Sequence, residues 1–583
     1  MNERISLTMI VRNEAAHLAD CLESVKDKVD EMIIVDTGST DDTISIARRY
    51  TPHVFTFPWR NDFSAARNFA LEHATGDWIL ALDADEEVQC QDPLSFHALI
   101  NSAKDKEAFL LPLLNPISDT TEEYNTFHVL RLFRNNLNYQ YIGKIHEQVT
   151  LPDQQKVGFA TSPTLKHKLL PLKICHQKRN RDLHLLKKAS QEDPHNPFLH
   201  YYLGVEWLML GKSAYALPFL QKAYSSLTDD NLLFRAPALK YLLVTLRSLG
   251  RLDEALALSL ETSLHYPNFT DIFYLGGLLF EDKKEYLIAL KWFNQAIDCG
   301  IPPALFSHLT GSESFLAYYH LGFCYERIGK TIEARGAYET ALELNPRYPY
   351  PLYNLFLILL SEKGSALCYQ NLADHSFLSD TLLCLTSAEL FFLSDHVEHA
   401  YLCLETHKDS FQRDERILYY HGKYSIYSGR AHAGLESLNQ ITTDSSYYPS
   451  AQSLSIVALI LLGDYLKAKS LAMTLWKNPS YRCEAHIFLC LIRLTQKQTI
   501  SPYQQSIRGK ETLSPITELL LDCKRYRSHE MSPLFEALSQ GLETLMTSSE
   551  DGFETLLNDY GQRIQDLNNR IVTKFGHGWV DKR

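Results

Sequence analysis

Two acidic residues, Asp83 and Asp85, stand directly after the short apolar run 78–82 and are separated by one alanine. At the end of a strand this alternation places both carboxylates on the same side of the chain. Carboxylate oxygens are hard ligands that suit Mg²⁺ or Mn²⁺, and a cation held there neutralises a diphosphate. An isolated Asp-X-Asp (DXD) is more often a solvated acidic turn, so the metal-site hypothesis depends on the elements around it.

Those elements alternate between strands and helices from residue 5 to about residue 90. Apolar β-rich runs and stretches with helical spacing predict strands at 5–11, 31–35, 53–57 and 78–82 and helices at 14–26, 43–50 and 63–74. This alternation is typical of βαβ units and a parallel sheet. Ligands of such sheets bind beyond the carboxyl ends of the strands, where Asn13-Glu14, Asp36–Ser39 and Asp83–Asp85 all fall. Their convergence favours a binding site over a solvated turn.

Beyond about residue 195 the sequence predicts helices in a repeating pattern. Matching small or aliphatic positions recur at Gly204, Leu243, Gly277 and Gly322, with separations of 39, 34 and 45 residues. Twelve residues further on stand Ala216, Ala255, Ala289 and Ala334. A unit of about 34 residues with small residues where helices cross resembles the tetratricopeptide repeat. Weaker units follow near residues 356, 422 and 456, so the second part of the chain is expected to be an all-α solenoid.

Composition narrows the class of protein. The 583 residues exceed what one hydrophobic core organises, so several domains are expected. The formal net charge of −13 argues against nucleic acid as a partner. No apolar run is long enough for a membrane span, and the N-terminus has no signal-peptide pattern. Eleven scattered cysteines without a close pair indicate reduced thiols, hence a cytoplasmic protein.

Four ordered motifs carry a family resemblance: Ile5–Glu14, Val35–Thr43, Asn61–Asn68 and Leu82–Glu86. Together they resemble family 2 glycosyltransferases with the GT-A fold, a Rossmann-like α/β domain with a mostly parallel sheet. The further run Tyr141–Glu147 and the attached repeats resemble a bacterial subgroup that fuses this domain to tetratricopeptide repeats and includes peptide S-glycosyltransferases. The resemblance implies inverting transfer from a nucleotide-sugar, usually a UDP-sugar, with a divalent metal, Mn²⁺ or Mg²⁺.

The resemblance also implies roles for individual residues. Val11, Asn13 and Glu14 would line the first strand end near the nucleotide, Asp36 would accept a hydrogen bond from the base, and Gly38 and Ser39 would let the chain pass close to it. Arg67 and Asn68 would face the sugar or the diphosphate. Asp83 would contact the ribose or the metal, and Asp85 would bind the metal directly. A cation at the phosphates stabilises the charge that develops on the leaving group.

Inversion also needs a general base that deprotonates the acceptor. Glu147 is the first candidate and His146 the second, although a His-Glu pair after a strand also fits a purely structural contact. For a third metal or diphosphate contact the order of motifs favours His167, with His176 as the rival. The family usually follows this histidine with Tyr or Gly-Tyr, whereas Lys168-Leu169 follows it here.

The resulting expectation is an enzyme, a hexosyltransferase-type glycosyltransferase. We expect a GT-A domain over 1–180, a helical connector over 181–196, clear repeats over 197–365, degenerate repeats over 366–500 and a C-terminal helical region over 501–583. The repeats would recruit a protein or peptide acceptor. Two alternatives stay open: a non-catalytic repeat scaffold with a degenerate nucleotide-sugar-binding domain, and a cell-envelope polysaccharide or lipopolysaccharide-core transferase. The sugar, the acceptor atom and the oligomeric state are not readable from the sequence.

Overall fold

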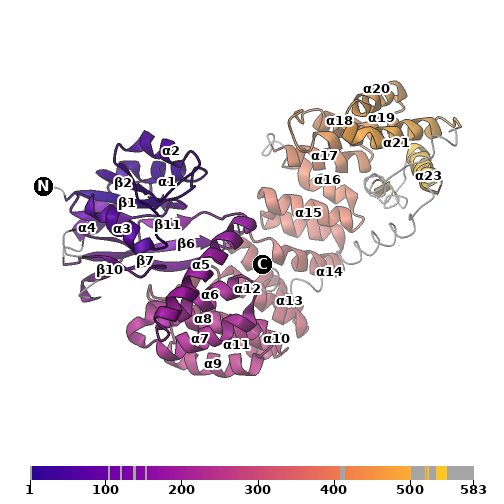
Figure 1. Ribbon diagram of the computed structural model, residues 1–583. Helices are drawn as coiled ribbons and strands as arrows, with labels where there is room; N and C mark the ends of the chain where they lie inside the picture. The colour runs from indigo at the N-terminus through magenta and orange to yellow at the C-terminus, as the bar shows by residue number, and fades with distance from the viewer. Residues whose placement is uncertain are drawn as a thin grey trace. The chain divides into compact units, whose positions relative to one another are not determined.

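The computed structural model describes residues 3–102, 105–118, 121–135, 139–150, 154–407, 414–499, 519, 522–523 and 533–547 (Figure 1). The chain divides into two compact units at the boundary between Ala337 and Tyr338. The first unit contains a large β-sheet and the helices packed on it, and the second unit is helical. Much of the predicted C-terminal region 501–583 lies outside the described residues.

The parallel half of the sheet confirms the predicted alternation of strands and helices. Strands β1 (Ile5–Val11), β2 (Glu31–Asp36), β3 (Val54–Thr56) and β4 (Trp78–Ala81) pair in the parallel order β3-β2-β1-β4. The helices that follow the first three are α1 (Leu18–Val25), α2 (Thr43–Tyr50) and α3 (Phe63–Glu72). The apolar side chains of β1 are buried in the core, which explains why these strands were readable from the sequence.

The other half of the sheet makes it mixed rather than uniformly parallel. From β4 the order continues β7-β6-β11-β5, and the β4–β7, β6–β7 and β11–β5 pairs are antiparallel. The bounds are β5 (Glu86–Gln89), β6 (Ala108–Pro116), β7 (Tyr124–Arg134), β8 (Tyr141–Ile142), β9 (Gln148–Val149), β10 (Val157–Phe159) and β11 (Thr164–His167), with α4 (Ser95–Ser102) after β5. Most of β7 is only half-buried, so its sequence lacks the apolar run of a core strand.

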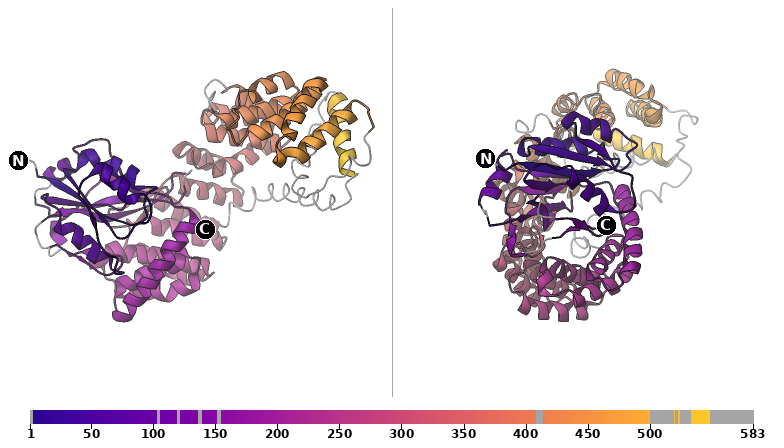
Figure 2. Two further views of the ribbon diagram at one scale, coloured as in Figure 1. Left: turned by 45° about the horizontal axis from the view of Figure 1, so that its top comes forward. Right: turned by 60° about the vertical axis from the view of Figure 1, so that its left-hand side comes forward.

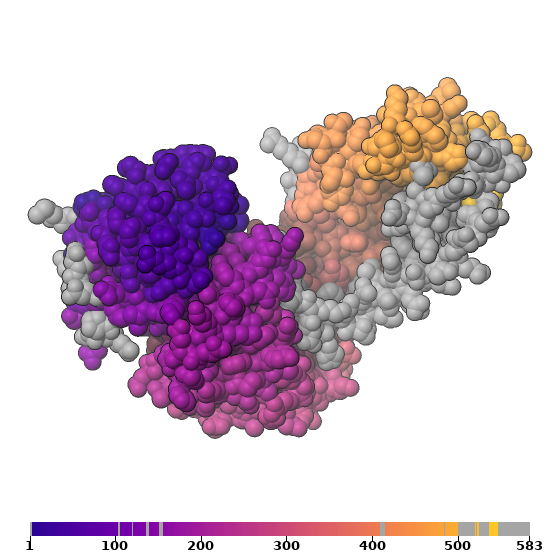
Figure 3. All heavy atoms as spheres, viewed as in Figure 1, coloured from indigo at the N-terminus to yellow at the C-terminus, as the bar shows by residue number. Residues whose placement is uncertain are grey.

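Helical hairpins occupy the rest of the first unit. Helix α5 (Leu172–Glu192) leads from the sheet domain into the pairs α6 (Pro197–Met209) and α7 (Ser213–Ser226), α8 (Leu232–Ser248) and α9 (Leu252–His265), and α10 (Thr270–Asp282) and α11 (Tyr286–Cys299). Next come α12 (Phe315–Arg327) and α13 (Thr331–Leu344), which continues into the second unit. In Figure 3 the magenta part of the chain, which holds the first of these helices, lies directly against the sheet domain.

The predicted small-residue contacts are confirmed at the helix crossings. The four alanines Ala216, Ala255, Ala289 and Ala334 are fully buried. A Cβ atom added at Gly204 would lie 2.5 Å from Leu220, and one added at Gly277 would lie 2.6 Å from Phe293. Such separations are shorter than side-chain packing tolerates, so glycine sets how closely the paired helices approach.

The second unit continues as helices. It contains α14 (Tyr350–Asp374), α15 (Thr381–Leu393), α16 (Val397–Glu405), α17 (Glu415–Tyr427), α18 (Ala431–Leu438), α19 (Tyr448–Leu461), α20 (Tyr465–Trp476), α21 (Arg482–Thr495) and α23 (Pro533–Thr547). Gly364 has a φ of +75° and interrupts α14, which lies where the sequence pattern loses its period. In the described part of the chain no helix has the length and apolar character that crossing a bilayer requires.

A short strand ties the helical hairpins to the sheet. The loop between α11 and α12 carries β12 (His308–Leu309), which pairs antiparallel with β7 at Asn125 and Thr126. This loop accounts for the separation of 45 residues instead of 34 between the repeat positions Gly277 and Gly322. Figure 2 shows the helices of the first unit as an arc beside the sheet.

A buried ion pair reinforces this attachment. Lys240 of α8 lies 2.6 Å from Asp271 of α10, and their side chains are 7% and 1% exposed. The same lysine donates to the Asn125 side chain, and Asp271 accepts from the backbone N–H of Leu309 in β12. One charge pair therefore holds two helices, the inserted strand and strand β7 of the sheet together.

Replacing Asp271 by alanine is expected to destabilise the full chain by about 3–5 kcal/mol, because the substitution leaves the Lys240 ammonium buried without its counter-charge. The measurement is the shift in urea and thermal unfolding. Asp253→Ala is the matched control, since Asp253 is 88% exposed in its pair with Lys283, and its loss is expected to cost no more than about 1 kcal/mol. Equal shifts for the two variants would show that the buried pair does not hold the attachment.

Candidate active site

The loops after β1 and β2 are bound to each other at the carboxyl edge of the sheet. Asn13 has a φ of +55°, its backbone N–H donates to the Ser39 hydroxyl, and its side-chain oxygen accepts from the Thr40 N–H at 2.7 Å. The Asp36 carboxylate accepts from the backbone N–H groups of Gly38 and Ser39. The loops after β1 and β2, which carry residues expected to bind the nucleotide, are therefore joined by hydrogen bonds into one corner of the sheet domain, formed by Asn13, Asp36, Gly38 and Ser39.

Asp83, directly after β4, lies between two arginines. One carboxylate oxygen is 2.6 Å from Arg67 of α3 and the other is 2.7 Å from Arg131 of β7. Burial of Asp83 opposes its ionisation, but the positive charges of Arg131 and Arg67 outweigh this, and they hold the pKa of Asp83 well below its usual range. This carboxylate is thus ionised and fixed in position.

The charged network extends on both sides of Asp83. Arg67 also pairs with Glu147, the candidate base, and Arg131 also pairs with Glu86, which is buried. Burial raises the pKa of Glu86 despite the neighbouring Arg131. The network therefore connects α3, β7, the turn after β4 and the segment before β9, and it fixes the direction in which Glu147 points.

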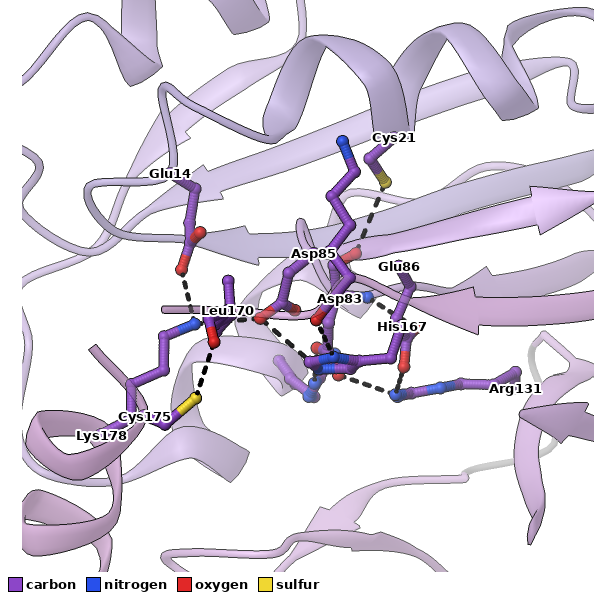
Figure 4. Close-up of polar contacts among 12 residues, drawn as sticks. Glu14, Cys21, Asp83, Asp85, Glu86, Arg131, His167, Leu170, Cys175 and Lys178 are labelled. Carbon is purple, nitrogen blue, oxygen red and sulfur yellow. Dashed lines mark hydrogen bonds and ion pairs between the residues drawn. The ribbon is translucent and has the colours of Figure 1, made fainter. Parts of the chain in front are cut away.

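Asp85 faces a second group of charges, drawn in Figure 4. Its Oδ2 atom lies 3.0 Å from Lys178 Nζ of α5 and 3.5 Å from His167 Nε2 at the end of β11. The same lysine lies 3.2 Å from Glu14, after β1. Antiparallel pairing of β11 with β5 puts His167 opposite Glu86 and so brings the histidine to the Asp-X-Asp turn.

These donors fit a divalent cation that is held jointly with a ligand. No group of three or more His, Cys, Asp or Glu side chains in the described ranges is arranged to hold a metal alone. Asp85 and His167 offer two donors on one side, and Mg²⁺ or Mn²⁺ in phosphate-binding sites commonly takes one or two protein ligands, waters and phosphate oxygens. The residues present therefore suit a cation that a diphosphate completes.

His146 is positioned by the first helical hairpin. Its ring stacks on that of Tyr202 in α6, with 3.7 Å between centroids and 5° between planes. Its Nε2 atom is buried and meets no hydrogen-bonding partner among the described residues. Burial lowers the pKa of His146 to about 4, so the ring is neutral near pH 7. Both properties favour a structural role for His146 over that of a base.

The remaining predicted residues occupy different surroundings. Val11 is buried at the end of β1. The Asn68 side chain exchanges two hydrogen bonds with the backbone of Tyr141, which fixes β8 against α3. His176 is exposed on α5, whereas His167 is the histidine beside Asp85.

Three residues of this region were not among the predicted site residues. Arg131 lies in a strand without a sequence pattern, and Tyr202 lies in α6, the first helix of the repeats. Lys178 was visible only as part of the basic run 178–181, for which a solvated helix face was a better interpretation than a contact with the diphosphate.

Replacing His146 by phenylalanine tests this electrostatic description. Because the folded protein binds the His146 proton more weakly than the unfolded chain does, the stability conferred by the neutral ring is complete above about pH 6.5 and is lost as the pH falls toward 4. Phenylalanine keeps the stack on Tyr202 and does not titrate. The difference in unfolding free energy between the two proteins should therefore change by roughly 3 kcal/mol across this range. Parallel stability curves would contradict the assigned pKa.

Comparison with known proteins identifies the sheet domain. Residues 6–156 match the model of the family described as Glycosyl transferase family 2, and residues 315–348 match the tetratricopeptide repeat. The chain is 30% identical over 309 residues to the SPbeta prophage-derived glycosyltransferase SunS of Bacillus subtilis, which covers 49% of this chain and 69% of SunS.

Two further relatives match shorter segments. A TPR repeat-containing protein of Synechococcus elongatus is 42% identical over 146 residues, which is 25% of this chain and 35% of the relative. A glycosyltransferase of Rickettsia felis is 43% identical over 96 residues, 16% of this chain and 34% of the relative. The chain thus spans about a third of the length of these two proteins and about two thirds of SunS.

Proposed function

Because the chain belongs to glycosyltransferase family 2, we propose that it transfers a sugar from a nucleotide-sugar donor to a protein or peptide acceptor, with inversion at the anomeric carbon. The observation that carries this proposal is the arrangement of charges at the carboxyl edge of the sheet. Asp85 lies beside His167 and Lys178, and the network of Asp83 leads through Arg67 to Glu147. A UDP-sugar is the proposed donor.

The donor is assigned to the corner formed after β1 and β2. Asn13, Glu14, Asp36, Gly38 and Ser39 line this corner and would hold the nucleoside. Asp85 and His167 would hold the Mn²⁺ or Mg²⁺ of the diphosphate, with Asp83 beside them. The metal supplies positive charge that stabilises the leaving diphosphate. Arg67 and Arg131 keep Asp83 fixed, so this carboxylate needs little reorganisation when the donor binds.

Transfer with inversion follows from a direct displacement. The acceptor's nucleophilic atom forms a bond to the anomeric carbon as the bond between that carbon and the phosphate oxygen breaks, and the bonding electron pair leaves with the diphosphate. Glu147 is the proposed base, and its carboxylate takes the acceptor's proton. The low pKa and the shielded Nε2 atom of His146 support Glu147 over its neighbour.

The repeats are the proposed means of recruiting the acceptor. In the first unit, Lys240 and Asp271 hold the chain's own sheet through Asn125 and β12, so that part of the repeat surface is committed within the molecule. Acceptor binding is therefore assigned to repeat surfaces outside this contact, including those of the second unit. Helical repeats offer extended surfaces of the kind that bind peptides.

Calorimetric titration with UDP tests the donor site. Wild-type protein is expected to bind UDP in the presence of Mn²⁺ and much more weakly without it, and Asp85→Ala should abolish the metal-dependent part. Asp105→Ala is the matched control, because Asp105 is 76% exposed in the loop before β6. Absence of metal-dependent binding by the wild-type protein would overturn the proposed UDP-sugar donor.

Replacing Glu147 by glutamine separates catalysis from binding. Loss of a general base is expected to reduce the transfer rate by about 10²–10⁴-fold while metal-dependent UDP binding stays nearly unchanged. Transfer is measured by mass spectrometry of acceptor peptides after a screen of UDP-sugars. Glu192→Gln, at an exposed partner of Lys144, is the control and should keep wild-type turnover. Normal turnover by Glu147→Gln would show that another group is the base.

A further inference from the structure

Lys178 places a positive charge where the proposed metal and diphosphate would meet. Its ammonium group contacts two carboxylates from different strand ends, Asp85 at 3.0 Å and Glu14 at 3.2 Å (Figure 4). These carboxylates are largely buried, with 11% and 17% of their side chains exposed. Two shielded carboxylates repel each other unless a cation lies between them, and the Lys178 ammonium group supplies that cation.

Lys178 and a metal ion would compete for the same oxygen atom of Asp85. Lys178 Nζ and His167 Nε2 both approach the Oδ2 atom of Asp85. A divalent cation bound to that oxygen would lie about 2 Å from it, inside the space that the ammonium group now fills. A metal held between Asp85 Oδ2 and His167 Nε2 would therefore compete with the Lys178 ammonium group for this oxygen.

The lysine side chain can move without moving its helix. Helix α5 is anchored further along by Leu183 and Leu186, which are buried in a core shared with Leu203 of α6. Arg179, the next residue, pairs with Glu206 of α6 at 3.3 Å. Lysine has a flexible four-carbon stem with three rotatable donors, so its ammonium group can change partners while α5 stays fixed.

We propose that Lys178 is an exchangeable counter-ion: it neutralises Asp85 and Glu14 until the metal displaces it, and its ammonium group then binds the donor's diphosphate. This proposal rests on the proposed function, since it assigns a new residue to the same donor site. It makes α5, the link between the sheet domain and the repeats, a part of that site. Metal and nucleotide would accordingly bind in a coupled manner.

Titration of Mn²⁺ alone, followed by electron paramagnetic resonance of the free ion, tests the exchange. Lys178→Met removes the competing cation and is expected to tighten Mn²⁺ binding by about tenfold or more, because Asp85 and Glu14 lose their internal counter-charge. Lys178→Arg keeps a positive charge and should stay near the wild-type affinity. Lys173→Met, at an exposed lysine of the same helix, makes the same change in net charge and is expected to leave Mn²⁺ binding unaltered.

Titration of UDP at saturating Mn²⁺ tests the second half of the proposal. Lys178→Met is expected to bind UDP about tenfold more weakly than the wild type, since the diphosphate loses one charge-assisted contact. Thermal unfolding of each variant confirms that the fold is kept. Opposite changes in the two affinities would establish the exchange, because loss of a merely structural ion pair would not strengthen one ligand and weaken the other.

The two titrations separate this proposal from the proposed function. Unchanged or weaker Mn²⁺ binding by Lys178→Met, or no Mn²⁺ binding by either protein, would overturn the exchange. Tighter Mn²⁺ binding with unchanged UDP binding would overturn the diphosphate contact. If Lys178→Met tightens Mn²⁺ binding but the wild-type protein has no affinity for UDP, Lys178 remains the counter-ion of a metal site. That result would count against the UDP-sugar donor.

Discussion

The pairing of Asp83 with two arginines is the interaction on which the geometry of the site depends. Arg67 comes from a helix of the parallel half of the sheet and Arg131 from the antiparallel half, so one carboxylate joins the two halves. The arginines in turn hold Glu147 and Glu86. Removal of Asp83 would leave Arg67 and Arg131 facing each other without the carboxylate that both contact, so this residue holds the two arginines together.

The same principle of paired charges acts at the attachment of the repeats. Lys240 and Asp271 lie in successive hairpins and reach the sheet through Asn125 and the inserted strand β12. In a repeat array each repeat contacts only its neighbours, so a contact with another domain needs an added segment. Here the added segment is the loop between α11 and α12. Through this loop, part of the repeat surface that was expected to recruit an acceptor contacts the chain's own sheet instead. The first helical hairpins therefore contact the sheet domain that carries the site, and they also begin the repeat array.

The sequence predicts what is local or periodic and misses what depends on distant pairing. The strands β1, β2 and β4 and the buried alanine Ala255 follow from apolar runs and a fixed period, which need no knowledge of partners. Strand β7 is half-buried and has no such run, so the sequence did not indicate that Arg131 belongs to the site. The separation of 45 residues between Gly277 and Gly322 did not predict a strand, and only the pairing of His308 and Leu309 with β7 shows what the longer loop does.

Helices α5 and α6 connect the repeat array to the candidate site of the sheet domain. Lys178 of α5 reaches Asp85, and Tyr202 of α6 supports the ring of His146, the neighbour of the proposed base. A shift of these helices would change the charge at Asp85 and the loop that carries Glu147 together. If the proposed acceptor binds the repeats and the proposed donor binds the loops after β1 and β2, coupling between the two follows only where both ligands bias the same helices.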